Sequence, residues 1–481
     1  MNRKRTKIVA TISDKNCETD FIKELYEAGM DLVRINSAHL NIEGALRIIN
    51  NVREVSDKIA IIIDTKGPEI RTTLCESPIS IGKGKTVRII GDPDKISSQD
   101  TIYVNLRTFA SDIPLGSKIM IDDGEIELKA IHKEDNSITC KAENEGIIGS
   151  RKSVNIPGVK LFLPSINDKD REFIRMAAEN DIDFIAHSFV RSRQDALDVQ
   201  AEIKKYNSEI KIIAKIENQE GVENITDILE VVYGIMVARG DLAIEIPYEK
   251  IPSIQRMIIS RCIYTRKPVI VATQMLHSMI TNPRPTRAEV SDIASAIYSQ
   301  TDAIMLSGET AFGKYPVEAV KTMTRVALEV ESNKEKFLDT PYLNITGEVS
   351  SYLAKVAVET ALRVGAKGII ADTVGGRTIR DMASYRGFKL ILSQCYSTRT
   401  MRELALSYGV YTSYQEKRKS VDEFMRIALK NLEGAHDLKG DDTVVVLAGN
   451  FSGGSGFSFI EVGSVEYLKD RERTHEDNLL V

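Results

Sequence analysis

Short apolar runs recur along most of the chain, and polar or charged residues follow each of them closely. Between the runs, apolar residues return every three or four positions, which is the spacing of an amphipathic helix. Short, nearly continuous apolar runs in this setting are typical of buried parallel strands. These runs are Lys7–Ile12, Leu32–Ile35, Ile59–Ile63, Phe184–Ala186, Lys211–Ala214, Ile235–Ala238, Val269–Ala272 and Ala303–Leu306. Strands that alternate with helices in this way predict an α/β fold, specifically a (β/α)₈ or TIM barrel.

Polar side chains gather just after the carboxyl end of each predicted strand. A barrel brings these ends to one face, where enzymes of this architecture carry out their chemistry. The residues are Thr11, Arg34, Asn36, Asp64, Thr65, His187, Ser188, Lys215, Glu217, Arg239, Asp241, Thr273, Gln274, Ser307 and Glu309. Random surface polarity would not favour one end of every strand, so the pattern predicts a catalytic face.

Lys215, Glu217 and Asp241 form the most informative group on this face. Residues two apart on a strand share a side, so Lys215 and Glu217 are expected to point into one site. Asp241 follows the next strand and would place a second carboxylate there. Two carboxylates suit Mg²⁺, which prefers oxygen ligands and keeps positions open for phosphate. Gly240 permits close backbone approach, and a helix starting at Asp241 would direct N–H groups at an anion. A surface salt bridge explains these residues equally well when they are taken alone.

The regular alternation stops between Gly67 and Pro157. Turn residues come close together there and separate strand-like runs at Lys118–Ile121, Ile126–Ile131 and Ser137–Lys141. This pattern predicts a small β-barrel domain inserted after the third barrel strand. An insertion at that face can act as a lid over the site.

A helix over Pro316–Val330 is expected to close the barrel, and a charged stretch from Glu331 to Pro341 predicts a linker. Alternating strands and helices then resume and predict an open α/β domain. The expected divisions are residues 1–66 and 158–341 for the barrel, 67–157 for the lid and 342–481 for the carboxyl-terminal domain, which could contact other subunits and bind an effector.

Composition narrows the class of protein. The 481-residue chain has a net charge of -5, so no basic field suggests nucleic acid as a partner. Its five cysteines are scattered and form no C-x-x-C pair, which indicates a reducing compartment without structural zinc. No apolar run approaches the ~20 residues that span a bilayer, and no signal-peptide pattern is visible. We therefore expect a cytoplasmic protein that contacts neither nucleic acid nor membrane.

Longer motifs carry a family resemblance. They are Arg34-Ile35-Asn36, Asp64-Thr65-Lys66-Gly67-Pro68-Glu69-Ile70-Arg71, Val154-Asn155-Ile156-Pro157-Gly158, Ala214-Lys215-Ile216-Glu217-Asn218, Ala238-Arg239-Gly240-Asp241-Leu242, Ala272-Thr273-Gln274-Met275-Leu276, Asn282–Glu289 and Asp302–Thr310. In order and spacing, from Lys7 to about Val462, the chain resembles the pyruvate kinase family. The resemblance implies phosphoryl transfer from phosphoenolpyruvate to ADP, giving pyruvate and ATP in the last step of glycolysis.

The resemblance also implies roles for the residues at the substrate site. Glu217 and Asp241 would hold Mg²⁺, and Lys215 would neutralise the phosphoryl oxygens and the developing enolate. Arg34 would bind the phosphate. The backbone of Arg239, Gly240 and Asp241 would bind the substrate carboxylate, with Thr273 beside it and near the route by which the enolate carbon is protonated.

Further sites follow from the same resemblance. Nucleotide contacts are implied for His39, Arg71 and Lys152, and K⁺ ligands for Asn36, Asp64 and Thr65. Glu69 matches the residue typical of potassium-dependent members, and we expect it to be an uncompensated carboxylate. Ala38 stands where the family usually has serine, so one hydroxyl ligand is lost. We expect K⁺ to activate with weakened affinity.

The carboxyl-terminal domain contains a loop that could cradle phosphate, because it follows a strand and opens a helix. It comprises Thr373, Gly375, Gly376, Arg377 and Thr378 and matches the family's effector-phosphate loop, with Gly449–Phe457 closing over it. The resemblance implies a sugar phosphate as the effector. An ordinary glycine-rich turn between a strand and a helix would have the same sequence pattern. A homotetramer is implied by the resemblance alone.

Two other functions stay open at this point. One is a different Mg²⁺ barrel acting on an enolate, such as a 2-oxoacid aldolase or lyase, which would need neither Arg71, Lys152 nor the lid. The other is a non-catalytic paralogue, which the retained Lys215, Glu217 and Asp241 argue against. Asn36 and Thr273 could simply cap helices.

Overall fold

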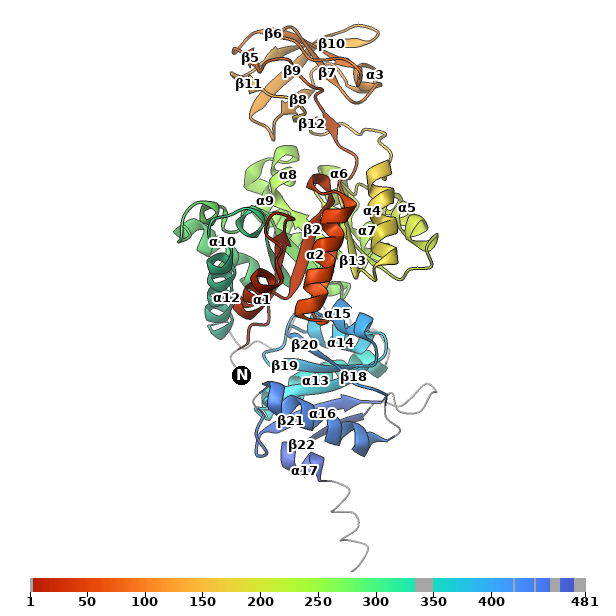
Figure 1. Cartoon of the computed structure of the whole chain (residues 1–481), viewed down its shortest axis with the longest axis vertical. Coiled ribbons are helices and arrows are strands. Elements are labelled where there is room, and N and C mark those ends of the chain that lie inside the picture. Colours follow the sequence, from red (N-terminus) through yellow and green to blue (C-terminus); the bar gives the residue numbers. More distant parts are fainter. Residues whose placement is uncertain (1–2, 334–348, 418–419, 437, 450–458, 471–481) are drawn as a thin grey trace, which may run out of the picture.

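Three parts of the chain are stacked along the long axis of the computed structural model (Figure 1). The structure describes residues 3–333, 349–417, 420–436, 438–449 and 459–470. The predicted lid lies at one end, the barrel in the middle and the carboxyl-terminal domain at the other end. Most of the predicted linker falls in 334–348, outside the described residues. No helix in the described part of the chain is long and apolar enough to cross a membrane.

The central part is a closed barrel of parallel strands, as predicted. Its order is β1-β17-β16-β15-β14-β13-β3-β2, and β2 returns to β1. The strands are β1 (Lys7–Ile12), β2 (Leu32–Asn36), β3 (Ala60–Asp64), β13 (Phe184–His187), β14 (Lys211–Ile216), β15 (Gly234–Ala238), β16 (Val269–Ala272) and β17 (Ala303–Leu306). The TIM-barrel prediction is therefore confirmed.

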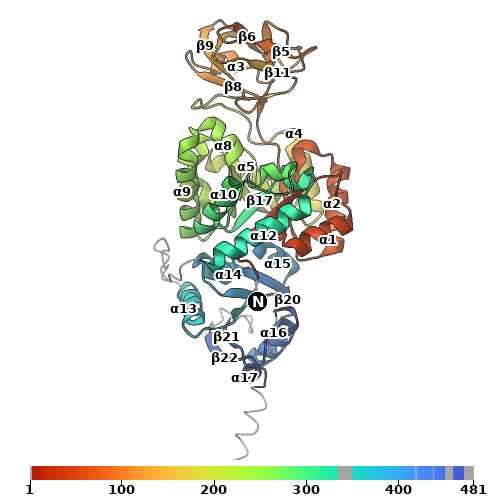
Figure 2. The same cartoon turned by 90° about the vertical axis from the view of Figure 1, so that its left-hand side faces the viewer.

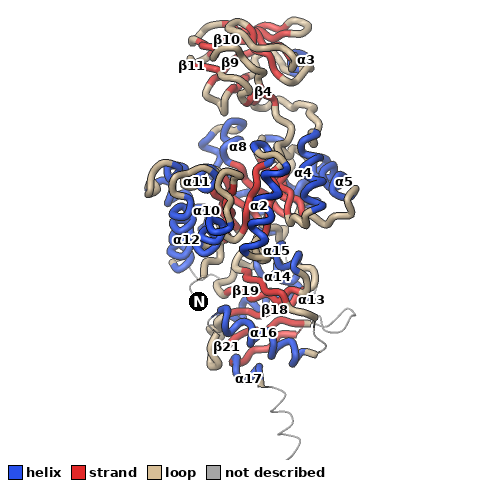
Figure 3. The backbone as a smooth tube through the Cα atoms, in the orientation of Figure 1, coloured by secondary structure: helices blue, strands red, loops and turns tan. Residues whose placement is uncertain are grey.

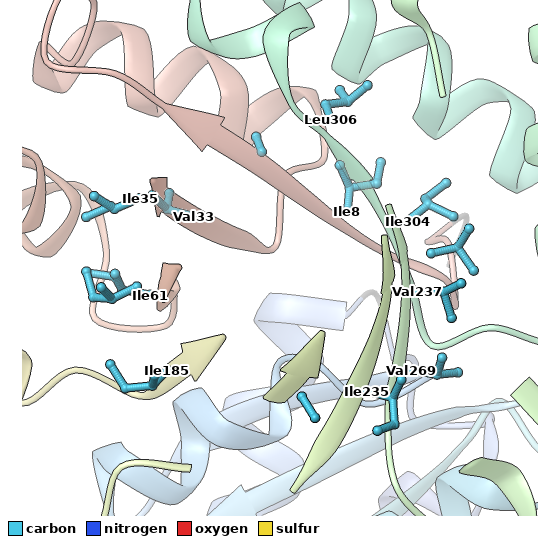
Figure 4. Close-up of a cluster of buried hydrophobic side chains, with 14 of the residues drawn as sticks. Ile8, Val33, Ile35, Ile61, Ile185, Ile235, Val237, Val269, Ile304 and Leu306 are labelled. Carbon is cyan, nitrogen blue, oxygen red and sulfur yellow. The ribbon is translucent and has the colours of Figure 1, made fainter. Parts of the chain in front are cut away.

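Alternating side chains of these strands pack in two separate layers. Outward residues such as Ile8, Val33 and Ile235 belong to the core beneath the helices (Figure 4). Their neighbours, among them Leu32 and Ile62, fill the inside of the barrel. Because side chains alternate along a strand, the inward series continues at the strand ends into the polar residues of the barrel mouth.

Helices surround this barrel and complete the outward core. They are α1 (Thr19–Ala28), α2 (Ile42–Val55), α4 (Asp168–Glu179), α5 (Arg193–Lys204), α6 (Gln219–Glu223), α7 (Ile225–Val231), α8 (Arg239–Glu245), α9 (Ile251–Tyr264), α10 (Arg287–Tyr298), α11 (Gly308–Ala311) and α12 (Pro316–Ser332), with 3₁₀ turns η1 (Ser37–His39), η2 (Tyr248–Lys250) and η3 (His277–Ile280). Several begin with capping boxes, such as Asn167 with Asp170 and Thr286 with Glu289. These caps satisfy the free N–H groups of the first turn, so each helix starts at a defined residue after its strand.

The inserted lid is a nearly closed β barrel that stands clear of the TIM barrel (Figure 2). Its elements are β4 (Ile70–Arg71), β5 (Ile79–Ile81), β6 (Thr86–Gly91), β7 (Thr101–Val104), α3 (Phe109–Asp112), β8 (Lys118–Ile121), β9 (Ile126–Lys133), β10 (Ser137–Ala142), β11 (Gly146–Ile148) and β12 (Ser153–Asn155). β8, β9 and β10 were predicted. β4 and β12, the strands that enter and leave the lid, pair with each other so that Arg71 lies opposite Ser153.

In the carboxyl-terminal domain, β18, β19 and β21 lie side by side (Figure 3). They belong to a five-stranded sheet in the order β20-β19-β18-β21-β22, in which the β21–β22 pair alone is antiparallel among the described strands. The elements are α13 (Val349–Arg363), β18 (Gly368–Thr373), α14 (Arg377–Ser384), β19 (Leu390–Cys395), α15 (Thr398–Leu404), β20 (Val410–Tyr414), α16 (Val421–His436), β21 (Thr443–Ala448), β22 (Phe459–Ser464) and α17 (Val465–Lys469). The predicted α/β domain is confirmed. β20, an edge strand with only one buried residue, was not predicted.

Candidate active site

Lys215 is the centre of the barrel mouth. Its Nζ lies 3.0 Å from Asp64 Oδ1 and 3.0 Å from Glu217 Oε1. The same ammonium donates a hydrogen bond of 2.7 Å to Ser188 Oγ. Its side chain is only 10% exposed. Three partners therefore hold a buried positive charge, and the sequence prediction that Lys215 and Glu217 share a site is confirmed.

Arg34 provides a second cation beside Lys215. Its guanidinium reaches Asp64 Oδ2 from Nε at 2.7 Å and from Nη2 at 2.5 Å. Arg34 Nη1 also donates to Thr11 Oγ1 at 3.2 Å. This two-pronged contact with one carboxylate orients the guanidinium, because the planar fork fits few other geometries.

Charge and burial compete at these groups. Burial alone would raise the pKa of Asp64, but Arg34 and Lys215 outweigh it and hold that pKa below its usual value. Burial would lower the pKa of Lys215, but Asp64 and Glu217 raise it. Glu217 behaves differently: burial, with Asp241 and Asp64 adding to it, raises its pKa to about 7 although Lys215 opposes the shift. Lys215 is thus kept protonated and positively charged. The negative charge of the Glu217 carboxylate is only partly balanced by the cations around it.

Glu217 and Asp241 are the two carboxylates that were predicted to hold Mg²⁺. Glu217 Oε2 accepts the Phe189 N–H at 2.6 Å and is almost fully buried. Asp241 lies in the first turn of α8 and, within the described residues, its carboxylate takes part in no hydrogen bond or ion pair. Together with Arg34 and Lys215, the cluster has two cations against three carboxylates, counting Asp64. Its unbalanced negative charge fits a divalent cation that takes its remaining ligands from water and substrate phosphate.

Thr273 connects the ends of two strands. Its Oγ1 donates to Ala272 O at 2.7 Å and accepts the Gly240 N–H at 2.8 Å. Thr273 therefore caps the first turn of α8, which supports the capping alternative without excluding contact with substrate. Its φ of 69° is strained for a β-branched residue, a feature that often marks functional sites.

The Arg239 side chain is bound to other groups of the protein rather than directed at the open face of the barrel. Its guanidinium donates to Thr273 O at 2.7 Å and pairs with Asp292 at 2.7 Å. Helix α8 begins at this residue, two positions before the predicted start at Asp241, because the strand ends directly at Ala238. Arg239, Gly240 and Asp241 are therefore all in the first turn.

A cleft of about 240 Å³ separates the lid from the barrel, and Arg71, Asp123, Asn155, Phe189 and Asp241 are among its lining residues. Arg71 and Lys152 come from the paired hinge strands or their immediate flank, as predicted, and their side chains are 39% and 37% exposed. Lys152 pairs with Asp122 at 2.7 Å.

Glu69 corrects one expectation. It is paired with Arg71 at 2.7 Å and with Lys66 at 3.1 Å, so it is not an uncompensated carboxylate. The sequence suggested otherwise because the direction of the neighbouring cationic side chains cannot be inferred from a loop. His39 lies at the exposed end of η1, outside this cluster.

The residues predicted to bind K⁺ are close together, but most of their oxygens already have partners. Asn36 Oδ1 accepts the Ala38 N–H at 3.1 Å, so Asn36 also caps η1. Asp64 is shared by Arg34 and Lys215. Thr65 Oγ1 faces His187 Nδ1 at 3.0 Å, while its carbonyl accepts from Ser188 Oγ at 2.7 Å.

The loop that was predicted to bind an effector has the expected strand–loop–helix geometry. Thr373 ends β18 and accepts the Gly376 N–H at 2.8 Å. Gly376 has a φ of 77°, which explains the glycine, and Arg377 and Thr378 begin α14. Gly375 is exposed beside them. The closing segment Gly449–Phe457 lies, beyond its first residue, outside the described residues.

Two neighbours of Lys215 and Glu217 were not assigned a role from the sequence. Ser188 was visible only as one more polar residue after a strand. Phe189 gave no signal, because its contribution is a backbone N–H and an unusual φ of 55°.

Comparisons with known proteins agree along the chain. A family model described as pyruvate kinase, barrel domain, matches residues 3–320, and one described as pyruvate kinase, alpha/beta domain, matches 352–461. A pyruvate kinase of Borreliella burgdorferi is 46% identical over 471 residues, covering 97% of this chain and 98% of that protein. One from Geobacillus stearothermophilus is 41% identical over 93% of this chain and 78% of its own. The crystal structure of a pyruvate kinase from Cryptosporidium parvum superposes with a TM-score of 0.90 and 34% identity over 96% of each chain. The chain belongs to the pyruvate kinase family.

Proposed function

We propose that the barrel mouth carries out the family reaction, transfer of the phosphoryl group of phosphoenolpyruvate to ADP, with Lys215 and Arg34 as its central cations. Pyruvate kinase activity follows from family membership; the assignment of roles is the proposal. The observation that carries it is Lys215 Nζ held 3.0 Å from both Asp64 and Glu217 in a buried setting. A fixed cation stabilises developing negative charge without having to reorganise during the reaction.

Substrate phosphate is assigned to Arg34 and Lys215. Arg34 directs three of its five N–H groups at Asp64 and Thr11, which leaves two for phosphate oxygens. The three N–H groups of Lys215 face Asp64, Glu217 and Ser188, so a phosphate oxygen would take the place of one of these partners. As the phosphoryl group leaves, negative charge grows on the enolate oxygen. Lys215 stabilises both charges from one position.

Glu217 and Asp241 are assigned to Mg²⁺. When bound, the ion would draw the substrate oxygens together and neutralise phosphoryl charge. Glu217 is oriented for this task by the Phe189 N–H and Asp241 by its place in the first turn of α8.

The substrate carboxylate is assigned to the first turn of α8, through the backbone of Arg239, Gly240 and Asp241, with Thr273 beside it. The Gly240 N–H is bonded to Thr273 Oγ1 in this structure, so carboxylate binding would exchange one acceptor for another. The hydroxyl released in that exchange would lie near the enolate carbon, which must be protonated to give pyruvate.

The nucleotide is assigned to the cleft under the lid, with Arg71 on its wall, Lys152 next to the lining residue Ser153, and His39 as a further contact. The two lid cations are half-exposed and paired with carboxylates that ADP phosphates can replace. K⁺ is assigned to Asn36, Asp64 and Thr65, with affinity weakened by Ala38. Both side-chain and backbone oxygens of Thr65 already have partners, His187 Nδ1 and Ser188 Oγ, so K⁺ would share these oxygens with them.

A sugar phosphate is assigned to the loop formed by Thr373, Gly375, Gly376, Arg377 and Thr378. Isothermal calorimetry with common sugar phosphates tests this assignment, and absence of binding by all of them would defeat it. We also expect the protein to be a homotetramer and to be located in the cytoplasm. Size-exclusion chromatography with light scattering would measure the mass of the assembly.

The deciding experiment is a coupled assay with phosphoenolpyruvate, ADP and Mg²⁺, with and without K⁺. We expect pyruvate formation that depends on ADP and Mg²⁺. Absence of turnover by the folded protein would favour the non-catalytic alternative.

A further inference from the structure

The loop Ser188–Arg191 joins β13 to α5 and contacts both groups that define the barrel mouth. Ser188 Oγ accepts a hydrogen bond from Lys215 Nζ at 2.7 Å and donates to Thr65 O at 2.7 Å. The backbone N–H of the next residue, Phe189, donates to Glu217 Oε2 at 2.6 Å. Adjacent residues of one loop therefore hold the central ammonium and one of the two proposed metal ligands.

Phe189 holds this position in an unfavourable conformation. Its φ of 55° lies in the left-handed region, which bulky L-residues rarely adopt. Such a conformation persists only where the surroundings over-determine it, and it is common at functional sites. In this conformation the Phe189 N–H donates to Glu217 while the Ser188 hydroxyl contacts Lys215.

Two glycines allow the loop to pack this tightly. A Cβ on Gly67 would lie 2.7 Å from Ser188 Cβ, and a Cβ on Gly221 would lie 2.5 Å from Val190 O. The Val190 N–H also donates to Lys215 O at 3.3 Å. The loop is thus fixed between the first hinge of the lid and the start of α6.

Arg191 fixes the far end of the loop. Its guanidinium donates to Leu161 O at 2.9 Å and to Leu163 O at 2.8 Å, in the segment that returns from the lid to the barrel. It also pairs with Asp195 at 2.9 Å. The loop therefore touches both connections between lid and barrel.

We propose that Ser188 and Phe189 are positioning residues for the phosphoryl transfer: the Ser188 hydroxyl sets the place of Lys215 Nζ, and the strained Phe189 backbone sets the Glu217 carboxylate. This inference rests on the roles proposed above for Lys215 and Glu217. Lys215 without Ser188 keeps two carboxylate partners but loses the group that holds it between them. A displacement of about 1 Å at a reacting group can cost ~100-fold in rate.

The first test removes the hydroxyl with Ser188→Ala. The matched control is Ser13→Ala, which deletes a hydroxyl bonded to Ala311 O at the same end of the barrel, away from Lys215. We expect Ser188→Ala to lower kcat roughly 10-fold or more, the loss typical of a hydrogen bond to a charged group. KM for phosphoenolpyruvate should stay within about threefold, and both variants should unfold at similar temperatures.

The second test compares Phe189→Val with Phe189→Leu. Both keep an apolar side chain in the cleft, but only valine adds β-branching, which the left-handed region tolerates worst. Calorimetric titration with Mn²⁺ alone reports on Glu217 without turnover. We expect Phe189→Val to bind Mn²⁺ roughly 10-fold more weakly than Phe189→Leu, and Ser188→Ala to bind it like wild type.

Two results would overturn the inference: kcat of Ser188→Ala within about twofold of Ser13→Ala, or equal Mn²⁺ affinity for the two Phe189 variants. If Phe189→Val does not fold, the kcat of Ser188→Ala decides alone. Lys215→Met is the reference in the same assay. Normal turnover by Lys215→Met would refute the proposed role of Lys215, whereas an inactive Lys215→Met beside a normal Ser188→Ala would refute the positioning claim only.

Discussion

The cationic side chains of the barrel mouth are buried, whereas those of the lid are partly exposed to solvent. Lys215 and Arg34 are each 10% exposed, and both are held by Asp64. Arg71 and Lys152 on the lid are 39% and 37% exposed, and their partners Glu69 and Asp122 belong to the lid and its hinge. Buried charges held by several partners are preorganised, whereas half-exposed ion pairs exchange partners at little cost. We infer that the barrel supplies transition-state stabilisation and the lid supplies nucleotide binding.

The largest expected effect comes from breaking the barrel side of this comparison. Lys215→Met removes the central cation but keeps a similar chain length, so turnover should fall by ~100-fold or more while KM for phosphoenolpyruvate changes less. The steady-state coupled assay measures both. Near-normal turnover would refute the assignment.

The second effect concerns the two carboxylates. Glu217→Gln and Asp241→Asn keep the side-chain shapes but remove charge, so both should shift the Mg²⁺ midpoint upward, by roughly 10-fold or more. Activity measured against Mg²⁺ concentration is the readout. Midpoints equal to wild type in both variants would contradict the proposed metal site.

A smaller effect is expected at the K⁺ site. Ala38→Ser restores a hydroxyl near Asn36, since the Ala38 N–H already contacts Asn36 Oδ1. The K⁺ midpoint should fall in this variant, because an alkali ion gains an oxygen ligand.

The control for that experiment is Ser37→Ala. Ser37 Oγ is fully buried and has no hydrogen-bond partner among the described residues. Activity is measured against K⁺ at constant ionic strength. Full wild-type activity without K⁺, or an unmoved midpoint in Ala38→Ser, would refute the K⁺ proposal.

The smallest expected effect concerns Lys7, a second buried lysine that can be compared with Lys215. Lys7 has one carboxylate within ion-pair distance, Asp31 Oδ1 at 3.7 Å, and the ammonium lies 3.9 Å from the centre of the Tyr411 ring. Burial lowers its pKa to about 8, in contrast to Lys215.

Linkage turns this pKa into a stability prediction. Between pH 8 and 10 the unfolded chain binds more protons at Lys7 than the folded protein does, so the contribution of Lys7 to the free energy of unfolding should rise with pH, by about 2 kcal/mol. Lys7→Met should remove that rise in urea unfolding measured across this range. The same pH dependence in wild type and variant would contradict the lowered pKa.

Much of this site was predictable because strand periodicity is simple. The positions of Lys215 and Glu217, two apart after a buried run, were enough to place them together on the inward face. Asp64 was harder to interpret. The resemblance assigned it to K⁺, and the structure also shows it paired with Arg34 on the adjacent strand β2 and with Lys215 across the intervening strand β13. That contact depends on strand register, which a single sequence does not reveal.

The short strands of the lid and the contacts of the loop after β13 could not be predicted from the sequence. Strands such as β4 and β12 have two or three residues, too few for a period-two pattern to emerge. Phe189 acts through its backbone, so its residue type carries no information about its contact with Glu217. Its neighbours Ser188 and Val190 pack against Gly67 and Gly221, tertiary contacts that a single sequence does not reveal.

The most direct test of the division between barrel and lid is to measure kcat and KM for ADP in Arg71→Met and Lys152→Met beside Lys215→Met. We predict that the lid variants raise KM for ADP roughly 10-fold while kcat stays within a few-fold of wild type, the reverse of Lys215→Met. A fall in kcat as large as that of Lys215→Met, with KM for ADP unchanged, would contradict the account.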